Sequence, residues 1–134
     1  MKIGCVKEIK KDEFRVGLTP HDVAEYVAHG HEMYIEAGAG EGSSFSDRDY
    51  AGAGARILPD AQSVWNDSDM IVKVKEPLAE EYDMMHEGQI LFTYLHLAAD
   101  RPLTNALVTR KVRAVAYETL RDAAGGLPLL KPMS

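Results

Sequence analysis

Three side chains that lie far apart in the sequence, Arg15, Lys75 and His96, could together bind a carboxylate and move a proton. The planar guanidinium of Arg15 can hold a carboxylate with two parallel hydrogen bonds, and the ammonium of Lys75 can meet it as a compact charge. The imidazole of His96 can act as acid or base near neutral pH. This set suits the binding of a small keto or amino acid, provided that the fold brings the three together.

Each of these residues also has a purely structural interpretation. Arg15, taken alone, is a surface arginine, and His96 is a hydrogen-bonded structural histidine. Lys73 and Lys75 would point the same way from a strand, and both could simply reach water at a sheet edge. Tyr94 has the same two-residue spacing from His96. The chemical interpretation of His96 gains weight because two consecutive predicted strands each end in a titratable group, and both interpretations stay open at this point.

The elements that must position these residues alternate between short β-type runs and helical stretches. The predicted strands are 2–6, 31–36, 56–58, 69–74, 88–94 and 112–116. Helices are predicted from Thr19–Pro20 to Gly30, from Ser46, around Asp60 to Trp65, over Glu80 to His86, and from Pro102 to Arg110, with a turn and a hairpin or extended exit after Glu118.

Strands separated by helix-sized segments predict one α/β domain with a mostly parallel sheet and helices on both faces, a Rossmann-like or flavodoxin-like architecture. Parallel sheets place ligand sites beyond the carboxyl ends of their strands. Lys75 and His96 fall at such ends.

Other motifs are better explained by structure than by chemistry. Gly38, Gly40 and Gly42 follow a strand, but Ser43 stands where a dinucleotide loop needs its third glycine, so a tight structural turn is favoured. His29 and His31 flank Gly30 without a third ligand nearby, so no metal site is predicted. Cys5 lies inside the first predicted strand and is interpreted as a small core residue.

Composition narrows the class of protein. The 134 residues suffice for one domain with a sizeable core, and 46% hydrophobic with 27% charged residues is typical of a globular chain. A net charge of -6 without a basic stripe argues against nucleic acid and against anionic membrane surfaces as partners. The single cysteine cannot form an internal disulfide, and no apolar run has transmembrane length, so a cytoplasmic location is expected.

Several blocks of the chain carry a family resemblance, in a fixed order from one end to the other. They are KEIKKDEFRVGLTP, GHEMYIEAGAGEGSSFSDRDYAGAGA, DMIVKVKEP, GQILFTYLHLAAD, VAYET and LPLLKPMS. Together they closely resemble the amino-terminal part of bacterial alanine dehydrogenases. The nucleotide-binding subunit of proton-translocating transhydrogenase belongs to the same family, and the YLHLA block favours the dehydrogenase over this more distant relative.

The resemblance implies an activity and a set of roles. The family reaction is the NAD-dependent, reversible oxidative deamination of L-alanine to pyruvate and ammonia. By resemblance, Arg15 and Lys75 hold the substrate carboxylate, and His96 is the proton donor and acceptor. The remaining matching positions are Tyr94 and Met133, which would line the substrate pocket, and Ser134, which would contact the cofactor.

The family's NAD-binding domain, with a catalytic aspartate, is expected to lie outside these 134 residues. We therefore expect the chain, residues 1–134, to be the substrate-binding domain, to bind NAD weakly or not at all, and to be inactive alone. A homo-oligomer or a separate NAD-binding domain is the expected partner. The alternatives are a non-catalytic binding or assembly module of a split dehydrogenase, and a domain like that of the transhydrogenase alpha-subunit, which would require a membrane partner.

Overall fold

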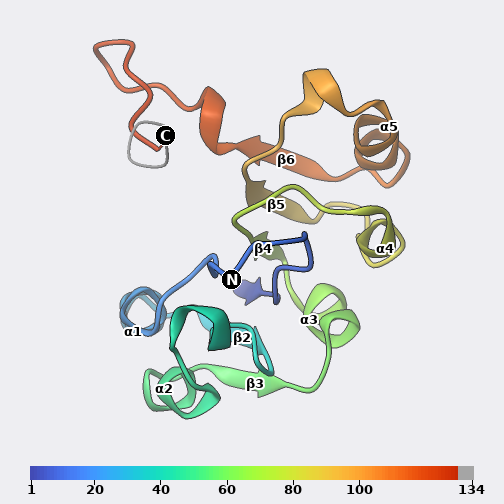
Figure 1. The fold of residues 1–134 in the computed structure, drawn as a ribbon. Coiled ribbons are helices and arrows are strands. Elements are labelled where there is room, and N and C mark those ends of the chain that lie inside the picture. Colours follow the sequence, from blue (N-terminus) through green and yellow to red (C-terminus); the bar gives the residue numbers. More distant parts are fainter. Residues whose placement is uncertain (130–134) are drawn as a thin grey trace.

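The computed structural model describes residues 1–129, and these form one α/β domain around a six-stranded sheet in which all strands are parallel (Figure 1). The strands are β1 (Lys2–Cys5), β2 (Glu32–Glu36), β3 (Arg56–Leu58), β4 (Met70–Val72), β5 (Ile90–Thr93) and β6 (Arg113–Ala116). Their order across the sheet is β3-β2-β1-β4-β5-β6. All six strands fall within the ranges that the sequence predicts.

Helices cover both faces of the sheet, as predicted. The α-helices are α1 (Pro20–Ala28), α2 (Asp47–Gly52), α3 (Ala61–Asp67), α4 (Ala79–Tyr82) and α5 (Arg101–Thr109), and the short 3-10 helices are η1 (Glu41–Ser43), η2 (Leu97–Ala99) and η3 (Tyr117–Thr119). Helices α1 and α2 pack on one face, and α3, α4 and α5 pack on the other (Figure 1). This division follows from right-handed crossovers that run outward from the centre of the sheet in two directions.

The starts of α1 and α2 confirm the predicted capping residues. Thr19 accepts a hydrogen bond from the backbone N–H of Asp22, whose carboxylate accepts in return from the N–H of Thr19. Ser46 and Asp49 form the same reciprocal pair at the start of α2. Each pair satisfies two backbone donors that a helix leaves without intrahelical partners.

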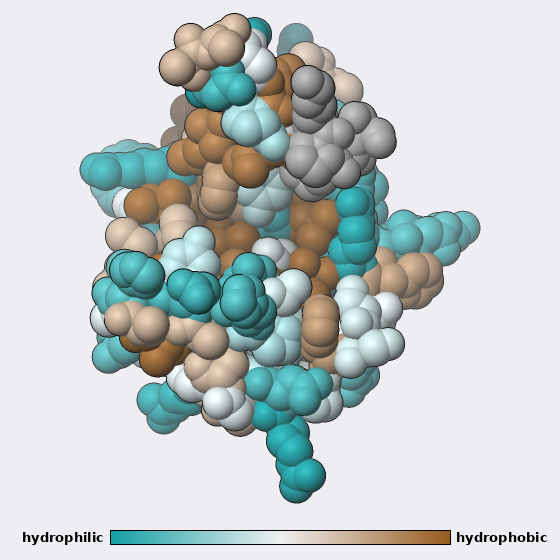
Figure 2. Space-filling view, turned by 90° about the vertical axis from the view of Figure 1, so that its left-hand side faces the viewer, coloured by the Kyte–Doolittle hydropathy of each residue, from teal (hydrophilic) through white to brown (hydrophobic). Residues whose placement is uncertain are grey.

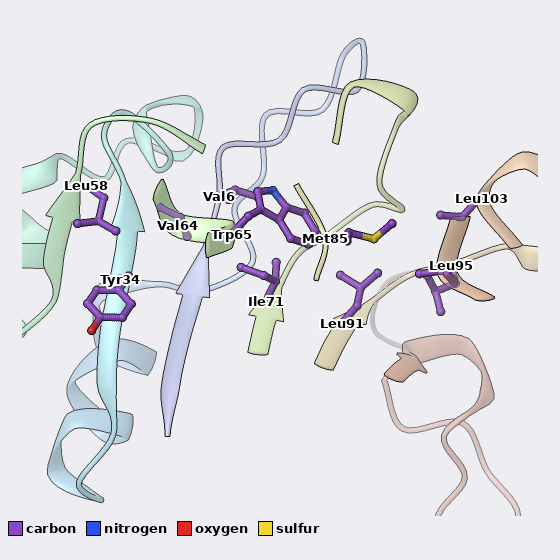
Figure 3. Packing of buried hydrophobic residues seen from close by; sticks show 11 residues of the cluster. Val6, Tyr34, Leu58, Val64, Trp65, Ile71, Met85, Leu91, Leu95 and Leu103 are labelled. Atoms are coloured by element: carbon purple, nitrogen blue, oxygen red, sulfur yellow. The ribbon is translucent and has the colours of Figure 1, made fainter. Parts of the chain in front are cut away.

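Two hydrophobic clusters, one on each side of the sheet, form the core. On the α3 side, Trp65 is fully buried and packs in one cluster with Ile71, Leu91 and Met85 (Figure 3). Gly4 in β1 lets α3 lie close to the sheet, because a Cβ there would stand 2.2 Å from the Ser68 hydroxyl oxygen. On the other side, Cys5 is fully buried among α1 and α2 residues, and burial raises the pKa of its thiol to about 12. The prediction that Cys5 is a core residue is confirmed.

One interpretation of the sequence is that Lys73 and Lys75 both reach water at a sheet edge. It is wrong for Lys73. β4 lies in the middle of the sheet, between β1 and β5, and ends at Val72. Lys73, the next residue, is 1% exposed, and its ammonium pairs with the carboxylates of Glu8, at 3.2 Å, and Glu81, at 3.3 Å. A buried ammonium needs such anions because it has lost its contact with water.

Smaller differences concern where elements end. Helix α4 ends at Tyr82 rather than His86, because Met84 and Met85 donate to carbonyls only three residues back and Met85 turns into the core. Glu118 lies in η3, and the described chain then forms a turn, in which Asp122 accepts from the N–H of Gly126. No strand follows within residues 1–129.

One part of the sheet is left without a helix. On the α1 side, no helix of residues 1–129 covers β4, β5 and β6 (Figure 1). Figure 2 shows apolar side chains gathered in a hollowed strip on this side. A hollow of about 250 Å³ here is lined by Tyr26, Val72, Phe92 and Tyr117, among others.

Two further features of residues 1–129 bear on partners. None of the helices is both long and apolar enough to cross a membrane. His, Cys, Asp and Glu side chains of this part of the chain form no group of three or more that could hold a metal ion.

Candidate functional site

The candidate residues lie at the carboxyl ends of the central strands, where the direction of the crossovers reverses. The loop of residues 6–18 follows β1 and carries Arg15, while Lys75 follows β4, the neighbour of β1 in the sheet. His96 follows β5, which lies next to β4. Ligands of open α/β sheets bind at such a switch point, because the loops diverge there and leave room between them.

Lys75 is held at its backbone on both sides. Its N–H donates to the Glu8 carboxylate, at 3.1 Å, and its carbonyl accepts from the Thr93 hydroxyl, at 2.9 Å. Its ammonium stands 5.4 Å from the centre of the Tyr94 ring, within the range of a cation–π contact. The backbone of Lys75 is thus fixed, while its charged group lies against an aromatic face.

His96 adopts a left-handed backbone conformation, with φ 52° and ψ 42°. Side chains other than glycine, asparagine and aspartate seldom adopt this region, which costs free energy. The carboxylate of Glu118 compensates by accepting the N–H groups of His96, at 3.0 Å, and Leu95, at 3.1 Å. The exposed imidazole lies 4.2 Å from the Tyr94 ring, centre to centre. Lys75, Tyr94 and His96 therefore form one continuous cluster.

Arg15 is held by Glu13 rather than lying free on the surface. The Arg15 Nε and Nη2 atoms donate to the two oxygens of the Glu13 carboxylate, at 2.9 and 2.8 Å, and the backbone N–H of Arg15 donates as well. The Arg15 hydrogen bonds hold the pKa of Glu13 below its usual value, and the charge of Lys75 lowers it further. The Glu13 carboxylate thus binds Arg15 through both of its oxygens. It takes one edge of the guanidinium, and the remaining N–H donors of Arg15 can meet a ligand.

A hollow of about 290 Å³ adjoins Arg15. Arg15, Ser43, Val74 and Tyr117 are among its lining residues. Lys75 and His96 are not, so the structure brings Lys75 and His96 together around the Tyr94 ring but joins Arg15 to them by no hydrogen bond, ion pair or ring contact among residues 1–129. Met133 and Ser134 lie outside the described residues.

The glycine-rich segment 38–42 supports the Arg15 loop. Gly38 has a positive φ of 82°, which fits the predicted tight turn. A Cβ on Gly42 would stand 2.7 Å from the backbone oxygen of Phe14, and Ser43 donates its hydroxyl to that same oxygen, at 3.0 Å. The absence of a side chain on Gly42 therefore lets this segment lie close to the backbone of Phe14, the residue before Arg15.

Replacing Gly42 with alanine is expected to destabilise the chain by about 1–3 kcal/mol, because backbone rather than a flexible side chain occupies the space. Urea denaturation measures this loss. Gly52→Ala is the matched control, since a Cβ at this position in α2 meets nothing within 4 Å. Equal stability of the two variants would show that Gly42 does not brace the loop.

The glycine-rich segment 38–42 is closely packed against its own chain rather than open to a dinucleotide cofactor such as NAD. Backbone and side chains of Phe14, Phe45 and Tyr50 fill the space that a pyrophosphate would need beside Gly40 and Gly42. The helix that follows, α2, begins only at Asp47, and the carboxylate of this first residue already accepts from the N–H of Gly38 in the loop, at 2.8 Å.

The sequence interpretation missed three carboxylates that hold the predicted residues in place. These are Glu8 at Lys75, Glu13 at Arg15 and Glu118 at His96. Glu8 and Glu118 follow directly after predicted strands, so the rule that selected Lys75 and His96 would have selected them too. Glu13 carries no such signal.

The fold and these side chains define a Rossmann-type α/β domain with two cations and an imidazole at its carboxyl edge. Residues 4–134 match the family described as "Alanine dehydrogenase/PNT, N-terminal domain". The chain belongs to this family, which confirms the resemblance drawn from its sequence blocks.

Similar proteins agree with this assignment. Alanine dehydrogenase from Mycolicibacterium smegmatis is 53% identical over 134 residues, which are 100% of this chain and 36% of that protein. A solved L-alanine dehydrogenase structure matches with a TM-score of 0.96 and 53% identity, covering 99% of this chain and 37% of the other. A transhydrogenase structure from Sinorhizobium meliloti matches with a TM-score of 0.86 and 25% identity, covering 92% and 35%. The chain thus spans little more than a third of the length of these relatives.

Proposed function

We propose that this chain is the substrate-binding part of an alanine dehydrogenase, which interconverts L-alanine with pyruvate and ammonia using NAD. The observation that supports the proposal best is the cluster of Lys75, Tyr94 and His96 at the carboxyl ends of β4 and β5, with Arg15 on the loop that follows the neighbouring strand β1. It lies at the switch point of a sheet whose chain is 53% identical, over its whole length, to a protein named alanine dehydrogenase. The dehydrogenase is preferred to the transhydrogenase because the latter match is only 25% identical.

The two cations would bind and orient the carboxylate that alanine and pyruvate share. Arg15 offers planar donors and Lys75 a compact charge that can approach from another direction. Fixing the carboxylate in this way orients the α-carbon relative to the other reacting groups, which removes much of the entropic cost of the reaction. Lys75 suits this role because its backbone is held by Glu8 and Thr93.

His96 would exchange protons with the amino group and with the water that adds to the imine carbon. Its ring is exposed, so a substrate can reach it, and its backbone is fixed by Glu118. A neutral imidazole can accept a proton as alanine is oxidised and return it in the reverse direction.

We assign NAD, the hydride acceptor, to a nucleotide-binding domain that residues 1–129 do not provide. The filled space at Gly40 and Gly42 supports this assignment. We propose further that the chain is cytoplasmic, works in a homo-oligomer or with a separate NAD-binding domain, and has no turnover by itself. Sustained NADH formation from alanine by the purified 134-residue chain would contradict the last point.

A chimera tests the function directly. Residues 1–134 of this chain would replace the matching 36% of the Mycolicibacterium smegmatis protein, which supplies the rest. We expect alanine-dependent NADH formation and pyruvate- and ammonia-dependent NADH oxidation. A folded, soluble chimera without either activity would reject the proposal and favour the second candidate, a non-catalytic binding or assembly module. The apolar hollow beside Tyr26 and Phe92, which no helix of residues 1–129 covers, is the observation that favours this candidate.

Arg15→Ala and Lys75→Ala are each expected to weaken pyruvate binding by about 1.5–3 kcal/mol, because each removes a charged hydrogen bond. Calorimetric titration of pyruvate into the chimera measures this, with Lys111→Ala as the control. Lys111 is an exposed lysine between α5 and β6, at the opposite end of the sheet. Unchanged affinity in both site variants would remove these cations from the substrate site.

A further inference from the structure

We propose that Glu8 is a positioning residue that fixes Lys75 for carboxylate binding. Its carboxylate accepts backbone hydrogen bonds just beyond β4, where β1 no longer pairs with that strand. This inference rests on the proposed function and extends it to a side chain that contacts no substrate. Glu8 lies in the loop after β1, and its side chain is 2% exposed.

Beyond the end of β4 the backbone still forms hydrogen bonds to the β5 side but no longer pairs with β1. On the β5 side, the N–H of Lys73 still donates to the Phe92 carbonyl, at 3.0 Å, and the N–H of Tyr94 to the Val74 carbonyl, at 3.3 Å. On the other side, β1 pairs with β4 only as far as Cys5 opposite Val72. The N–H groups of the following residues therefore need another acceptor, because they are buried or half-buried.

The Glu8 carboxylate is this acceptor. One of its oxygens accepts from the N–H of Val74, at 3.1 Å, and the other from the N–H of Lys75, also at 3.1 Å. An ionised carboxylate donates nothing and can accept at both oxygens, so it can stand in for the carbonyls of a missing strand. The Lys75 peptide is completed by Thr93, whose hydroxyl donates to the Lys75 carbonyl.

Lys73 keeps Glu8 in this role. Its ammonium lies 3.2 Å from the Glu8 oxygen that also accepts from Lys75. Burial tends to lower the pKa of Lys73, but the charges of Glu81 and Glu8 outweigh it and raise the pKa above the ordinary value. Lys73 therefore stays charged and balances the buried carboxylate of Glu8. Glu81 is the second partner of Lys73, at 3.3 Å, yet its own backbone contact is to Leu78, at the start of α4.

This difference between Glu8 and Glu81 provides a matched pair of variants. Glu8→Gln and Glu81→Gln each remove one buried carboxylate from Lys73, so both should lower stability, but only Glu8→Gln disturbs the Lys75 peptide. In the active chimera we expect Glu8→Gln to raise the KM for pyruvate about 10- to 100-fold with little change in kcat, because substrate binding depends on the position of Lys75. Glu81→Gln should change the KM for pyruvate by less than about threefold.

A second variant covers the case in which Glu8→Gln does not fold. Thr93→Val keeps the side-chain shape and the Glu8–Lys73–Glu81 ion pairs but removes the donor to the Lys75 carbonyl. It should also raise the KM for pyruvate, by about 3- to 10-fold. An increase with Glu8→Gln that Glu81→Gln does not share supports the proposal, as does the increase with Thr93→Val where Glu8→Gln is unfolded. Equal KM effects of the two glutamine variants overturn it, as does an unchanged KM in Thr93→Val where Glu8→Gln is unfolded.

The two proposals fail in different ways. If the unsubstituted chimera is inactive, the proposed function fails, and the role of Glu8 fails with it. If that chimera is active and Glu8→Gln behaves like Glu81→Gln, only the role of Glu8 is rejected and the buried ion pairs are purely structural.

Discussion

Replacing His96 with asparagine in the chimera is expected to lower kcat by about 10²–10⁴-fold, because the variant loses the side chain that exchanges protons with substrate. Asparagine is chosen over alanine because His96 has a φ of 52°, and asparagine tolerates this left-handed region better than most residues. The loop and the contacts of Glu118 with the backbone should therefore persist. Steady-state rates with alanine and NAD give the measurement.

The affinity for pyruvate separates this chemical role from a structural one. Since Arg15 and Lys75 remain, His96→Asn should bind pyruvate nearly as well as the unsubstituted protein. His29→Asn is a suitable control, because His29 is exposed at the end of α1 and its imidazole contacts only the Glu25 carbonyl of its own helix. If kcat in His96→Asn stays within tenfold of the control, about 1.4 kcal/mol, another group must move the proton.

The sequence was sufficient to predict the layers of the fold and the carboxyl edge of the sheet as the place of the candidate site. Periodicity located six strands, and capping residues located the starts of α1 and α2. These signals are local, so a single sequence contains them. The order of the strands was not predicted, because the choice of neighbours in the sheet depends on contacts between distant segments.

The partners of the predicted residues could not be read in the same way. Lys73 and Lys75 look equivalent in the sequence, yet one is a buried ion and the other lies half-buried against Tyr94. The two lysines differ because β4 ends at Val72 and because the side chain of Glu8, 65 residues before Lys73, lies next to the Lys73 ammonium. Their position after predicted strands marks Glu8 and Glu118 as candidates, but no local pattern in the sequence pairs Glu8 with Lys73 or Glu118 with His96.

Replacing Lys73 with methionine is expected to lower the free energy of unfolding by about 3–5 kcal/mol. Methionine fills a similar volume, so the loss comes from two buried carboxylates, Glu8 and Glu81, that are left without a cation. Burial already raises the pKa of Glu81 in the unsubstituted chain, and loss of the Lys73 charge should raise it further. Urea denaturation of the 134-residue chain measures the change.

A control variant and the pH dependence of the stability loss identify the cause of the loss in Lys73→Met. Lys111→Met removes the partner of Glu87, and both side chains of this pair are exposed, at 70% and 73%, so this variant should lose less than about 1 kcal/mol. A carboxyl whose pKa is higher in the folded than in the unfolded state costs stability once the pH rises above its unfolded value, about 4.3 for glutamate. The destabilisation of Lys73→Met should therefore be full near pH 7 and smaller near about pH 4. A loss no larger than that of Lys111→Met, or one independent of pH, would mean that the buried lysine does not hold these carboxylates in place.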